Sequence, residues 1–209
     1  MTTTAITPID NAAVLADFSG GTQSDIAMMI GVGLVKDSEA VFFQYVGDLG
    51  TPEALMLPSG KPLTRLANVR LSGIDIAEDI GEFKSTKINL FFESNQGRIV
   101  MLTAGLTTIW TQCVLTSLMG MLKDLSTTSF SLDSWKGTSK MRPCFAAIRV
   151  GQAKVSDQEM YDLLAEARGN RDSAMTQQLC RNAVAQIQSA IGVQPADVVV
   201  EETKTEGDF

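Results

Sequence analysis

The sequence predicts a mainly β fold with helices, in which a five-stranded Greek-key barrel precedes two C-terminal helices and a disordered acidic tail. Alternation of apolar and polar residues runs through most of residues 66–150, which is the pattern of strands with one buried face. One amphipathic helix interrupts this alternation, and two more helical stripes follow it before residue 192. With 44% apolar and 20% charged residues among 209, the chain has the composition of a globular protein with one good core.

Residues 1–60 are expected to form an N-terminal extension that contains a short strand pair. The first 25 residues are rich in Thr, Ala, Asp and Gly and predict a partly ordered lead-in. The aromatic and β-branched run at 40–46 predicts a strand, and residues 54–57 can pair back onto it after a turn that contains Pro52.

The barrel is predicted from five strands and one helix between residues 61 and 154. Turn residues at 94–97 join the second strand to the third, and an acidic connection at 75–82 joins the first to the second. A helix begins after Thr107 or Thr108 as its N-cap, with Trp110 on its apolar stripe as an expected core residue. The predicted strands are 66–76, 87–93, 98–103, 128–136 and 144–150.

Two helices are predicted after the barrel. The residues from Ser156 to Glu159 have the spacing of a capping box and open a helix to about Arg168. A second stripe over 173–191 stops at Gly192. The expected organisation is an N-terminal extension at 1–60, the barrel at 61–154, a helical segment at 155–194 and the disordered tail at 195–209.

The composition excludes several kinds of active site. The chain has no histidine, which rules out Ser-His and Cys-His nucleophilic mechanisms and histidine-containing zinc sites. Its three cysteines, Cys113, Cys144 and Cys180, are far apart, which favours reduced thiols in a cytosolic compartment. We therefore expect no cofactor and no metal. No apolar run reaches the ~18 residues of a membrane span and the first residues lack a secretion signal, so we expect a cytoplasmic protein without membrane contact.

Positive charge is concentrated in the predicted barrel, although the whole chain has a net charge of −7. Residues 61–154 contain twelve Lys and Arg against seven Asp and Glu, a balance of about +5, so the remainder has about −12. A basic middle between acidic ends suits a polyanionic ligand on the barrel.

The strand at 87–93 combines the two kinds of side chain that single-stranded nucleic acid requires. Its apolar residues alternate with Lys87, Asn89 and Phe91, so an aromatic ring shares the outer face with a cation. Cations can follow the phosphates, and each base stacked on a ring contributes roughly 1–3 kcal/mol. Phe91 is therefore predicted to stack a base. The alternative for Phe91 is burial under the N-terminal strand pair or a C-terminal helix.

Trp135 is the second predicted stacking residue, because it lies on the polar face of its strand and opens a basic loop. The alternative for Trp135 is packing as a lid. In the last strand Phe145 alternates with Arg149, which again places a ring and a cation on one face. The predicted nucleic-acid contacts are Arg70, Lys84, Lys87, Phe91, Arg98, Trp135, Lys136, Lys140, Arg142, Phe145 and Arg149.

An enzyme built from this chain would have to use carboxylates. Asp75, Glu78, Asp79 and Glu82 could hold magnesium for phosphoryl chemistry, but they lie in one predicted loop without a basic or nucleophilic partner. No phosphate loop, dinucleotide-binding motif or nucleophile elbow is present in the sequence. We therefore expect no enzymatic activity. A nuclease that uses these carboxylates and magnesium is kept as a third hypothesis, after the two given below.

The order strand–strand–strand–helix–strand–strand over 66–150, its interleaved cations and aromatic residues, and the acidic tail ending in Phe resemble the single-stranded DNA-binding proteins of bacteria and their phages. Their oligonucleotide-binding (OB) fold is a five-stranded Greek-key barrel. The resemblance covers about half of the chain and implies that the tail is disordered, docks replication and repair proteins, and competes with DNA. The matching tail positions are Glu201, Glu202, Glu206, Asp208 and Phe209.

The leading hypothesis is a non-enzymatic single-stranded DNA-binding protein for replication, recombination or repair, with RNA left open as a ligand. We expect it to act as a homo-oligomer in the cytoplasm of a prokaryotic or phage-infected cell and to recruit proteins through residues 201–209. The main alternative is a phage or plasmid assembly scaffold. Such a scaffold would use the helix at 173–191 and the acidic ends as protein interfaces and would not bind nucleic acid.

Overall fold

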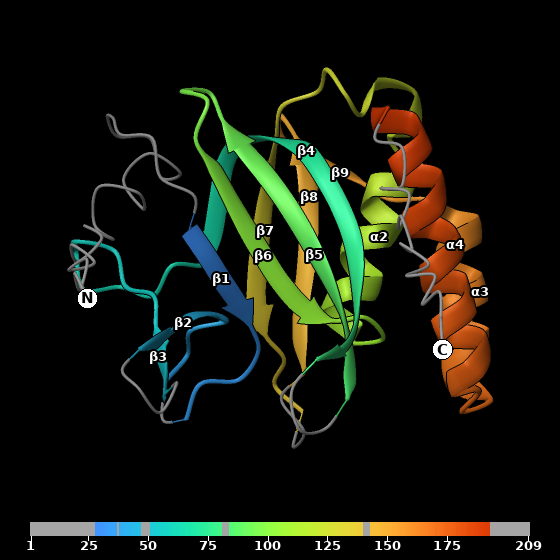
Figure 1. Cartoon of the computed structure of the whole chain (residues 1–209), viewed down its shortest axis with the longest axis horizontal. Coiled ribbons are helices and arrows are strands. Elements are labelled where there is room, and N and C mark those ends of the chain that lie inside the picture. The colour runs from blue at the N-terminus through green and yellow to red at the C-terminus, as the bar shows by residue number, and fades with distance from the viewer. Residues whose placement is uncertain (1–27, 37, 47–50, 81–83, 140–142, 193–209) are drawn as a thin grey trace, which may run out of the picture.

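The computed structural model describes residues 28–36, 38–46, 51–80, 84–139 and 143–192, which form one mixed β-sheet with helices packed against it (Figure 1). The strands are β1 (Met28–Val32), β2 (Phe42–Val46), β3 (Thr51–Ala54), β4 (Arg65–Ile80), β5 (Ser85–Ser94), β6 (Ile99–Gly105), β7 (Phe130–Lys136), β8 (Cys144–Val150) and β9 (Ala153–Val155). The helices are α2 (Ile109–Met119), the short 3-10 helix η1 (Leu122–Asp124), α3 (Gln158–Gly169) and α4 (Ser173–Ile191).

The strands of the described chain follow the order β3-β2-β1-β6-β5-β4-β7-β8-β9. Neighbouring strands are antiparallel except β1 and β6, which are parallel. The five strands predicted for the barrel are consecutive in this order, from β6 to β8, and α2 lies between the third and fourth of them in sequence. The predicted mainly β fold with helices is confirmed.

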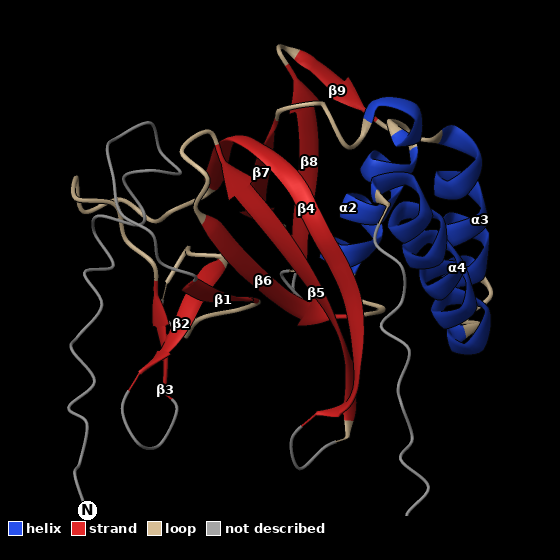
Figure 2. Cartoon of the chain, turned by 45° about the horizontal axis from the view of Figure 1, so that its top comes forward, coloured by secondary structure: helices blue, strands red, loops and turns tan. Residues whose placement is uncertain are grey.

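The sheet is open, which differs from the predicted five-stranded barrel. Closing these five strands would pair β6 with β8, whereas β6 pairs with β1 and β8 pairs with β9. The additional strands satisfy backbone N–H and C=O groups that would otherwise be exposed at the two edges. β4 and β5 form a long curved ribbon (Figures 1 and 2), and register shifts between Leu71 and Gly73 and between Ala77 and Ile80 promote this bending.

β4 is longer than predicted, so part of the expected acidic connection belongs to a strand. Asp75 accepts a hydrogen bond of 2.7 Å from Asn89 Nδ2, and Glu78 accepts one of 2.8 Å from Thr86 Oγ1. These partners on β5 satisfy the acidic side chains, which is why strand pairing continues through a polar stretch. Glu82 lies outside the described residues.

The core lies between the inner face of the sheet and α2. Trp110 is 1% exposed, and its indole Nε1 donates a hydrogen bond of 2.9 Å to Ser134 Oγ on β7. Thr108 is the N-cap of α2, and its Oγ1 accepts a hydrogen bond from the backbone N–H of Thr111. The predicted helix start and the predicted core position of Trp110 are both confirmed.

The two predicted C-terminal helices are confirmed, and with α2 they lie at the end of the molecule opposite β1–β3 (Figure 2). α3 begins one residue later than a capping box at Ser156 would place it, because Asp157 accepts a hydrogen bond of 2.7 Å from the N–H of Met160. α4 packs on β4 and ends at Gly192, whose φ of 74° favours glycine. No helix in the described ranges is long and apolar enough to cross a membrane.

One sheet and one core cross the domain boundaries that we expected at residues 60 and 154. β2 pairs with β3 inside the predicted N-terminal extension, but β3 is Thr51–Ala54 rather than the predicted 54–57, so Pro52 lies in the strand and not in the turn. β1, which was not predicted, joins this pair to β6. A single cluster of buried residues includes Met28 of β1 and Ile187 of α4. The N-terminal strands and the C-terminal helices therefore share one core with the strands between them.

Candidate nucleic-acid interface

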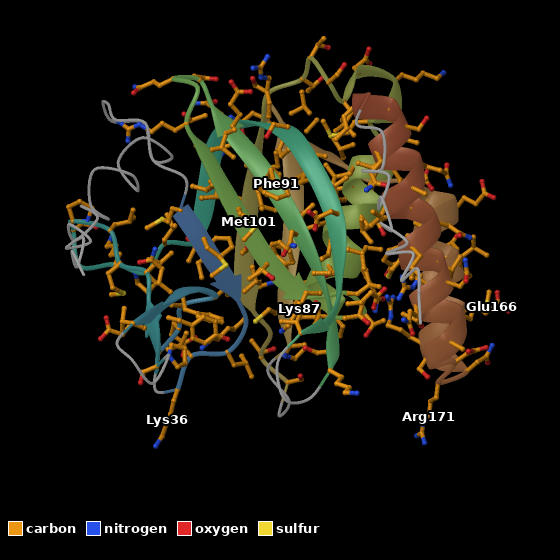
Figure 3. All side chains as sticks on the ribbon, in the orientation of Figure 1. Lys36, Lys87, Phe91, Met101, Glu166 and Arg171 are labelled. Carbon is orange, nitrogen blue, oxygen red and sulfur yellow. The ribbon has the colours of Figure 1, made fainter. Side chains whose placement is uncertain are left out.

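The outer face of the sheet, which is the face opposite the core, is best defined on β5. Leu90 and Phe92 are fully buried, whereas Lys87, Asn89 and Phe91 alternate with them and are partly exposed. Figure 3 shows Lys87 and Phe91 on the face turned to the viewer, beside the helices rather than beneath them. The two faces predicted for this strand are confirmed.

An apolar row crosses the outer face through four strands. The register places Met29 of β1 beside Met101 of β6, Met101 beside Phe91 of β5, and Phe91 beside Gly73 of β4. Met29 is 54% exposed, and Met101 and Phe91 are partly exposed. We call these four residues the Met–Phe row. Flexible thioethers beside a ring form an apolar surface that adapts to ligands of different shapes.

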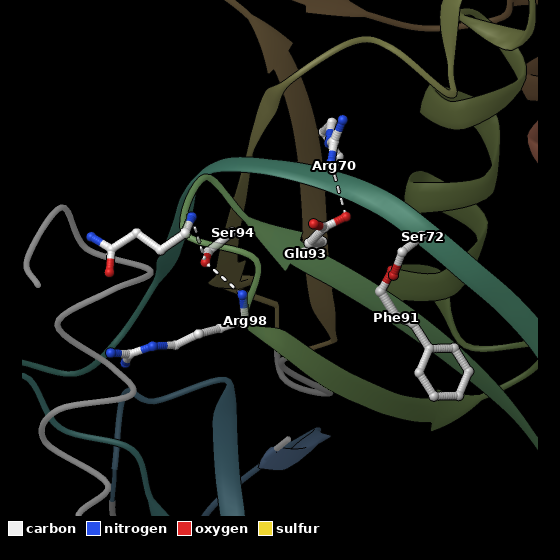
Figure 4. Close-up of polar contacts among 7 residues, drawn as sticks. Arg70, Ser72, Phe91, Glu93, Ser94 and Arg98 are labelled. Atoms are coloured by element: carbon white, nitrogen blue, oxygen red, sulfur yellow. Dashed lines mark hydrogen bonds and ion pairs between the residues drawn. The ribbon is translucent and has the colours of Figure 1, made fainter. Parts of the chain in front are cut away.

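Phe91 lies over Gly73, and the glycine makes this position possible. A Cβ atom at Gly73 would be 3.1 Å from Phe91 Cδ2 and 3.4 Å from Phe91 Cβ. The ring is therefore supported by the sheet while it remains partly exposed. Ser72 Oγ donates a hydrogen bond of 3.1 Å to the backbone carbonyl of Phe91, which fixes the two strands at this point (Figure 4). The role of Phe91 in stacking stays a prediction.

The predicted cations near the Met–Phe row differ in their surroundings. Arg70 Nη2 is 2.9 Å from Glu93 Oε2 (Figure 4). These side chains are 45% and 28% exposed, and exposed ion pairs contribute about 0–1 kcal/mol, so Arg70 can exchange the carboxylate for another anion. Lys87 is partly exposed on β5, and Lys84 is exposed at the start of that strand.

A second aromatic site lies on β7 and β8. Trp135 and Phe145 are cross-strand partners, with ring centroids 6.1 Å apart and ring planes inclined by 19°. Trp135 is 44% exposed and Phe145 is partly buried. We call these residues the Trp–Phe pair. Because the rings are nearly parallel, a further aromatic ring can continue the stack. The role of Trp135 in stacking and the alternative in which it packs as a lid both stay predictions.

Two arginines share one carboxylate beside the Trp–Phe pair. Asp133 Oδ1 is 3.5 Å from Arg65 Nε, and Asp133 Oδ2 is 3.1 Å from Arg149 Nε. The register places Arg65 beside Asp133, and Trp135 lies two residues further along β7 on the same outer face. This cluster keeps one net positive charge. Sequence reasoning missed Arg65, because it precedes the first clear alternation of its strand.

Two predicted phosphate contacts have other surroundings than expected. Arg98 is 2% exposed, so the side chain is buried rather than presented to a ligand. Lys136 Nζ donates hydrogen bonds to the backbone carbonyl of Val35 at 3.3 Å and to that of Ser38. Lys136 thus joins the end of β7 to the segment between β1 and β2. Strand alternation does not reveal such contacts, because they depend on residues far away in the sequence.

Several predicted positions lie outside the described residues. These are Lys140 and Arg142 of the basic loop, and Glu201, Glu202, Glu206, Asp208 and Phe209 of the tail. Their roles in binding DNA or partner proteins therefore stay predictions.

Two of the carboxylates considered for a magnesium site, Asp75 and Glu78, have protein partners. Glu78 accepts a hydrogen bond from Thr86 and forms an ion pair of 2.5 Å with Arg181 of α4. These contacts, and the hydrogen bond from Thr86 above all, hold the pKa of Glu78 below its ordinary value. Within the described part of the chain, no group of three or more His, Cys, Asp or Glu side chains could hold a metal ion.

Two of the cysteines do not have the character of an activated nucleophile. Burial raises the pKa of Cys180 to about 12, and burial also raises the pKa of the Cys144 thiol. The thiolate is the reactive form, so a raised pKa lowers reactivity at neutral pH. The third cysteine, Cys113, is partly buried, and none of the three forms a disulfide in the described structure.

Comparison of the chain with protein-family models, curated proteins and solved structures found no significant match. The function is therefore argued from the outer face of the sheet. The chemistry available there is stacking on exposed rings and binding of anions by arginine and lysine.

Proposed function

We propose that this chain is a non-enzymatic protein that binds single-stranded DNA along the outer face of its sheet. The observation that carries the proposal is the Trp–Phe pair, in which one of two nearly parallel rings is 44% exposed beside two arginines that share a carboxylate. A base can stack on the exposed ring while a neighbouring phosphate binds an arginine. This combination is what single-stranded nucleic acid requires of a protein surface.

The geometry of the Trp–Phe pair supports stacking from one side. Phe145 supports one face of the Trp135 ring at a centroid distance of 6.1 Å. The opposite face of Trp135 can then receive a base, which contributes roughly 1–3 kcal/mol. Every base has such a face, so this mode of binding tolerates any sequence.

The Met–Phe row extends the proposed binding surface across the sheet. Arg65 and Arg70 lie on the outer face of β4, between the Trp–Phe pair on one side and β5 on the other. A strand that stacks on Trp135 can therefore cross β4 and reach Phe91. The Arg65 and Arg70 side chains are 52% and 45% exposed in their ion pairs, so a phosphate can replace the carboxylate at little cost.

The strand order supports an OB-like architecture as part of this proposal. The order β6-β5-β4-β7-β8, with α2 between β6 and β7 in sequence, is compatible with the five-stranded Greek-key fold that binds oligonucleotides. Within the proposal, the acidic residues 201–209 dock replication or repair proteins. The chain then acts as a homo-oligomer in the cytoplasm of a prokaryotic or phage-infected cell.

An assembly scaffold that does not bind nucleic acid is the second candidate. The observation in its favour is the exposed apolar surface on β1 and β2, where Met29 is 54% and Tyr45 is 57% exposed. Contiguous exposed apolar surface also suits a protein partner. The two candidates differ in one simple respect, because a scaffold leaves the fluorescence of Trp135 unchanged when an oligonucleotide is added.

Titration with a dT oligonucleotide, followed by tryptophan fluorescence, tests the proposal. Trp110 is 1% and Trp135 is 44% exposed, so quenching reports on Trp135. We expect saturable quenching, and three or four phosphate contacts predict a loss of affinity of roughly 20- to 50-fold between about 50 and 200 mM salt. The matched control is the same sequence as a duplex, which should bind more weakly. Absence of both quenching and a gel shift would favour the scaffold.

A further inference from the structure

A pocket of about 260 Å³ lies between the Trp–Phe pair and α3. Its walls include the rings of Trp135, Phe145 and Tyr161 and two cations, Lys154 and Arg168. Among the described residues that line it, none is Asp or Glu. Its volume is just below the range of about 300–1,000 Å³ for pockets of drug-sized ligands, so it suits a single small aromatic ring with an anionic substituent.

The pocket opens beside an edge of the sheet. In the described chain β9 pairs with only Ile148–Val150 of β8, so the first half of β8 has no strand on that side. α3 provides another wall, with Leu164 buried and Tyr161, which precedes it by one turn, 51% exposed. The ring of Tyr161 therefore stands at the mouth of the pocket.

We propose that this pocket receives one base of the bound single strand, an inference that rests on the proposed function. Phe145 belongs both to the Trp–Phe pair and to the wall of the pocket, so a strand that stacks on Trp135 passes the pocket mouth. Tyr161 provides a stacking surface for the base. Lys154 and Arg168 bind the phosphates on either side of it.

The amide and hydroxyl groups of the pocket are engaged with other protein groups and do not select a base. Gln112 Nε2 donates a hydrogen bond of 2.7 Å to the carbonyl of Thr107, and Gln112 Oε1 accepts one from Arg168. Thr116 Oγ1 donates a hydrogen bond of 2.7 Å to the carbonyl of Gln112. Because these groups already have partners, recognition depends on stacking and charge rather than on the hydrogen-bonding edge of the base. The pocket therefore does not select among bases by their hydrogen-bonding edges.

We test this inference on the full chain with a set of dT oligonucleotides. All have the length of the shortest dT strand that binds with full affinity, and each lacks the base at one position, a different position in each oligonucleotide. For the wild type we expect one abasic position to weaken binding by about 5- to 150-fold, more than its neighbours do, because the base in the pocket is lost. Tyr161→Ala should weaken binding of the intact strand by a similar factor and abolish the additional penalty at that position. Tyr161→Phe keeps the ring and should bind as the wild type does.

Charge variants give an independent check of the same pocket. Lys154→Ala should lower the affinity for the intact strand and reduce its dependence on salt, because one phosphate contact is lost. Lys123→Ala is the matched control, since Lys123 is exposed on η1 and does not line the pocket. Lys123→Ala should leave both quantities unchanged. Circular dichroism confirms that each variant is folded.

The outcomes separate the pocket from the proposed function. If Tyr161→Ala and Lys154→Ala bind every oligonucleotide as the wild type does while Trp135→Ala binds weakly, the pocket inference is wrong and the proposed function stands. If the wild type does not bind the intact strand, both are wrong. If one abasic position weakens binding of the wild type more than the others do, and Tyr161→Ala lacks this additional loss, the result supports both the pocket inference and the proposed function.

Discussion

The Met–Phe row and the Trp–Phe pair lie on the same outer face, but they present their aromatic rings differently. In the row, Phe91 lies over Gly73 and is supported from below by the sheet. In the pair, Trp135 stands beside Phe145 with nearly parallel rings and is 44% exposed. The row thus adds apolar area, whereas the pair offers a ring face on which a base can stack. Two exposed aromatic sites on one sheet are therefore not equivalent as ligand contacts.

The charges beside these two sites differ as well. Beside the row, Arg70 is paired with Glu93, and this pair is neutral. Beside the pair, Arg65 and Arg149 share Asp133, and this cluster keeps one positive charge. Of these two ion-paired groups, the one beside the Trp–Phe pair therefore attracts a phosphate more strongly. We expect both stacking and phosphate binding to depend more on the pair than on the row.

Trp135→Ala is expected to have the largest effect. Loss of the exposed ring should reduce the affinity for a dT oligonucleotide by about 5- to 150-fold, whereas Phe91→Ala should reduce it by less than about fivefold, because Phe91 is only partly exposed. Fluorescence anisotropy of a labelled oligonucleotide measures both. Trp135→Phe keeps a ring and serves as the control. A greater loss for Phe91→Ala than for Trp135→Ala would reverse the comparison.

Lys136→Met tests a cation that we assign to structure rather than to binding. The variant removes the hydrogen bonds to the carbonyls of Val35 and Ser38 but keeps an unbranched side chain. Hydrogen bonds that involve a charged group contribute about 1.5–3 kcal/mol, so the free energy of unfolding should fall by about 1.5 kcal/mol. Urea denaturation gives this value. Unchanged stability together with weak oligonucleotide binding would show that Lys136 contacts the ligand instead.

Asp133→Asn and Glu93→Gln each remove one carboxylate from one of the two sites. Asp133→Asn leaves two arginines without their shared partner and should raise the affinity for oligo-dT by about two- to fivefold, with a steeper dependence on salt. Glu93→Gln affects only Arg70 and should raise the affinity less. Titrations at two salt concentrations compare the variants. A larger gain in affinity for Glu93→Gln than for Asp133→Asn would indicate that the DNA phosphates lie nearer the Met–Phe row than the Trp–Phe pair.

Glu78→Gln is expected to have the smallest effect, because Glu78 pairs with α4 rather than with either aromatic site. Thr86 and Arg181 hold the pKa of Glu78 below its ordinary value of 4.5. A carboxyl group with a lowered pKa stabilises the folded state above pH 4.5, and this contribution is lost as the pH falls through the folded-state pKa.

The stability difference between the wild type and Glu78→Gln should therefore be constant between about pH 6 and pH 8 and should shrink below about pH 4.5. Urea denaturation at a series of pH values measures this difference. Oligonucleotide binding at neutral pH should be the same in both proteins. A difference in stability that persists unchanged to acid pH would contradict the assignment.

Elements that depend on neighbouring residues could be predicted, and elements that depend on distant ones could not. The strand expected at 144–150 is β8, and Thr108 caps α2 as expected. Both follow from side chains within a few positions of each other. β1 was missed because its pairing with β6 joins segments about 70 residues apart, such as Met28 and Val100. The open sheet could not be predicted for the same reason. Five strands in this order can close into a barrel or accept further strands at their edges, and the choice depends on segments that are distant in the sequence.

The candidate site could be predicted to a similar extent. The period of two in a strand determines the face on which Phe91 and Trp135 lie, and these faces were predicted correctly. The surroundings of Arg98 and Lys136 could not be predicted, because burial and carbonyl partners depend on tertiary contacts. Tyr161 was missed for the same reason. It becomes part of a pocket only when α3 and β8 meet at the same place.

The parallel pairing of β1 with β6 has a consequence for how the chain is synthesised. Met28 leaves the ribosome about 70 residues before Val100, its partner on β6. At a synthesis rate of about 5–20 residues per second, β1 waits roughly 4–14 s for that partner. During this interval its apolar side chains, Met28 and Ile30, have not yet reached the core that later buries them. The strand that completes the Met–Phe row is thus made several seconds before the strand with which it pairs, and its apolar side chains lack their partner on β6 during that interval.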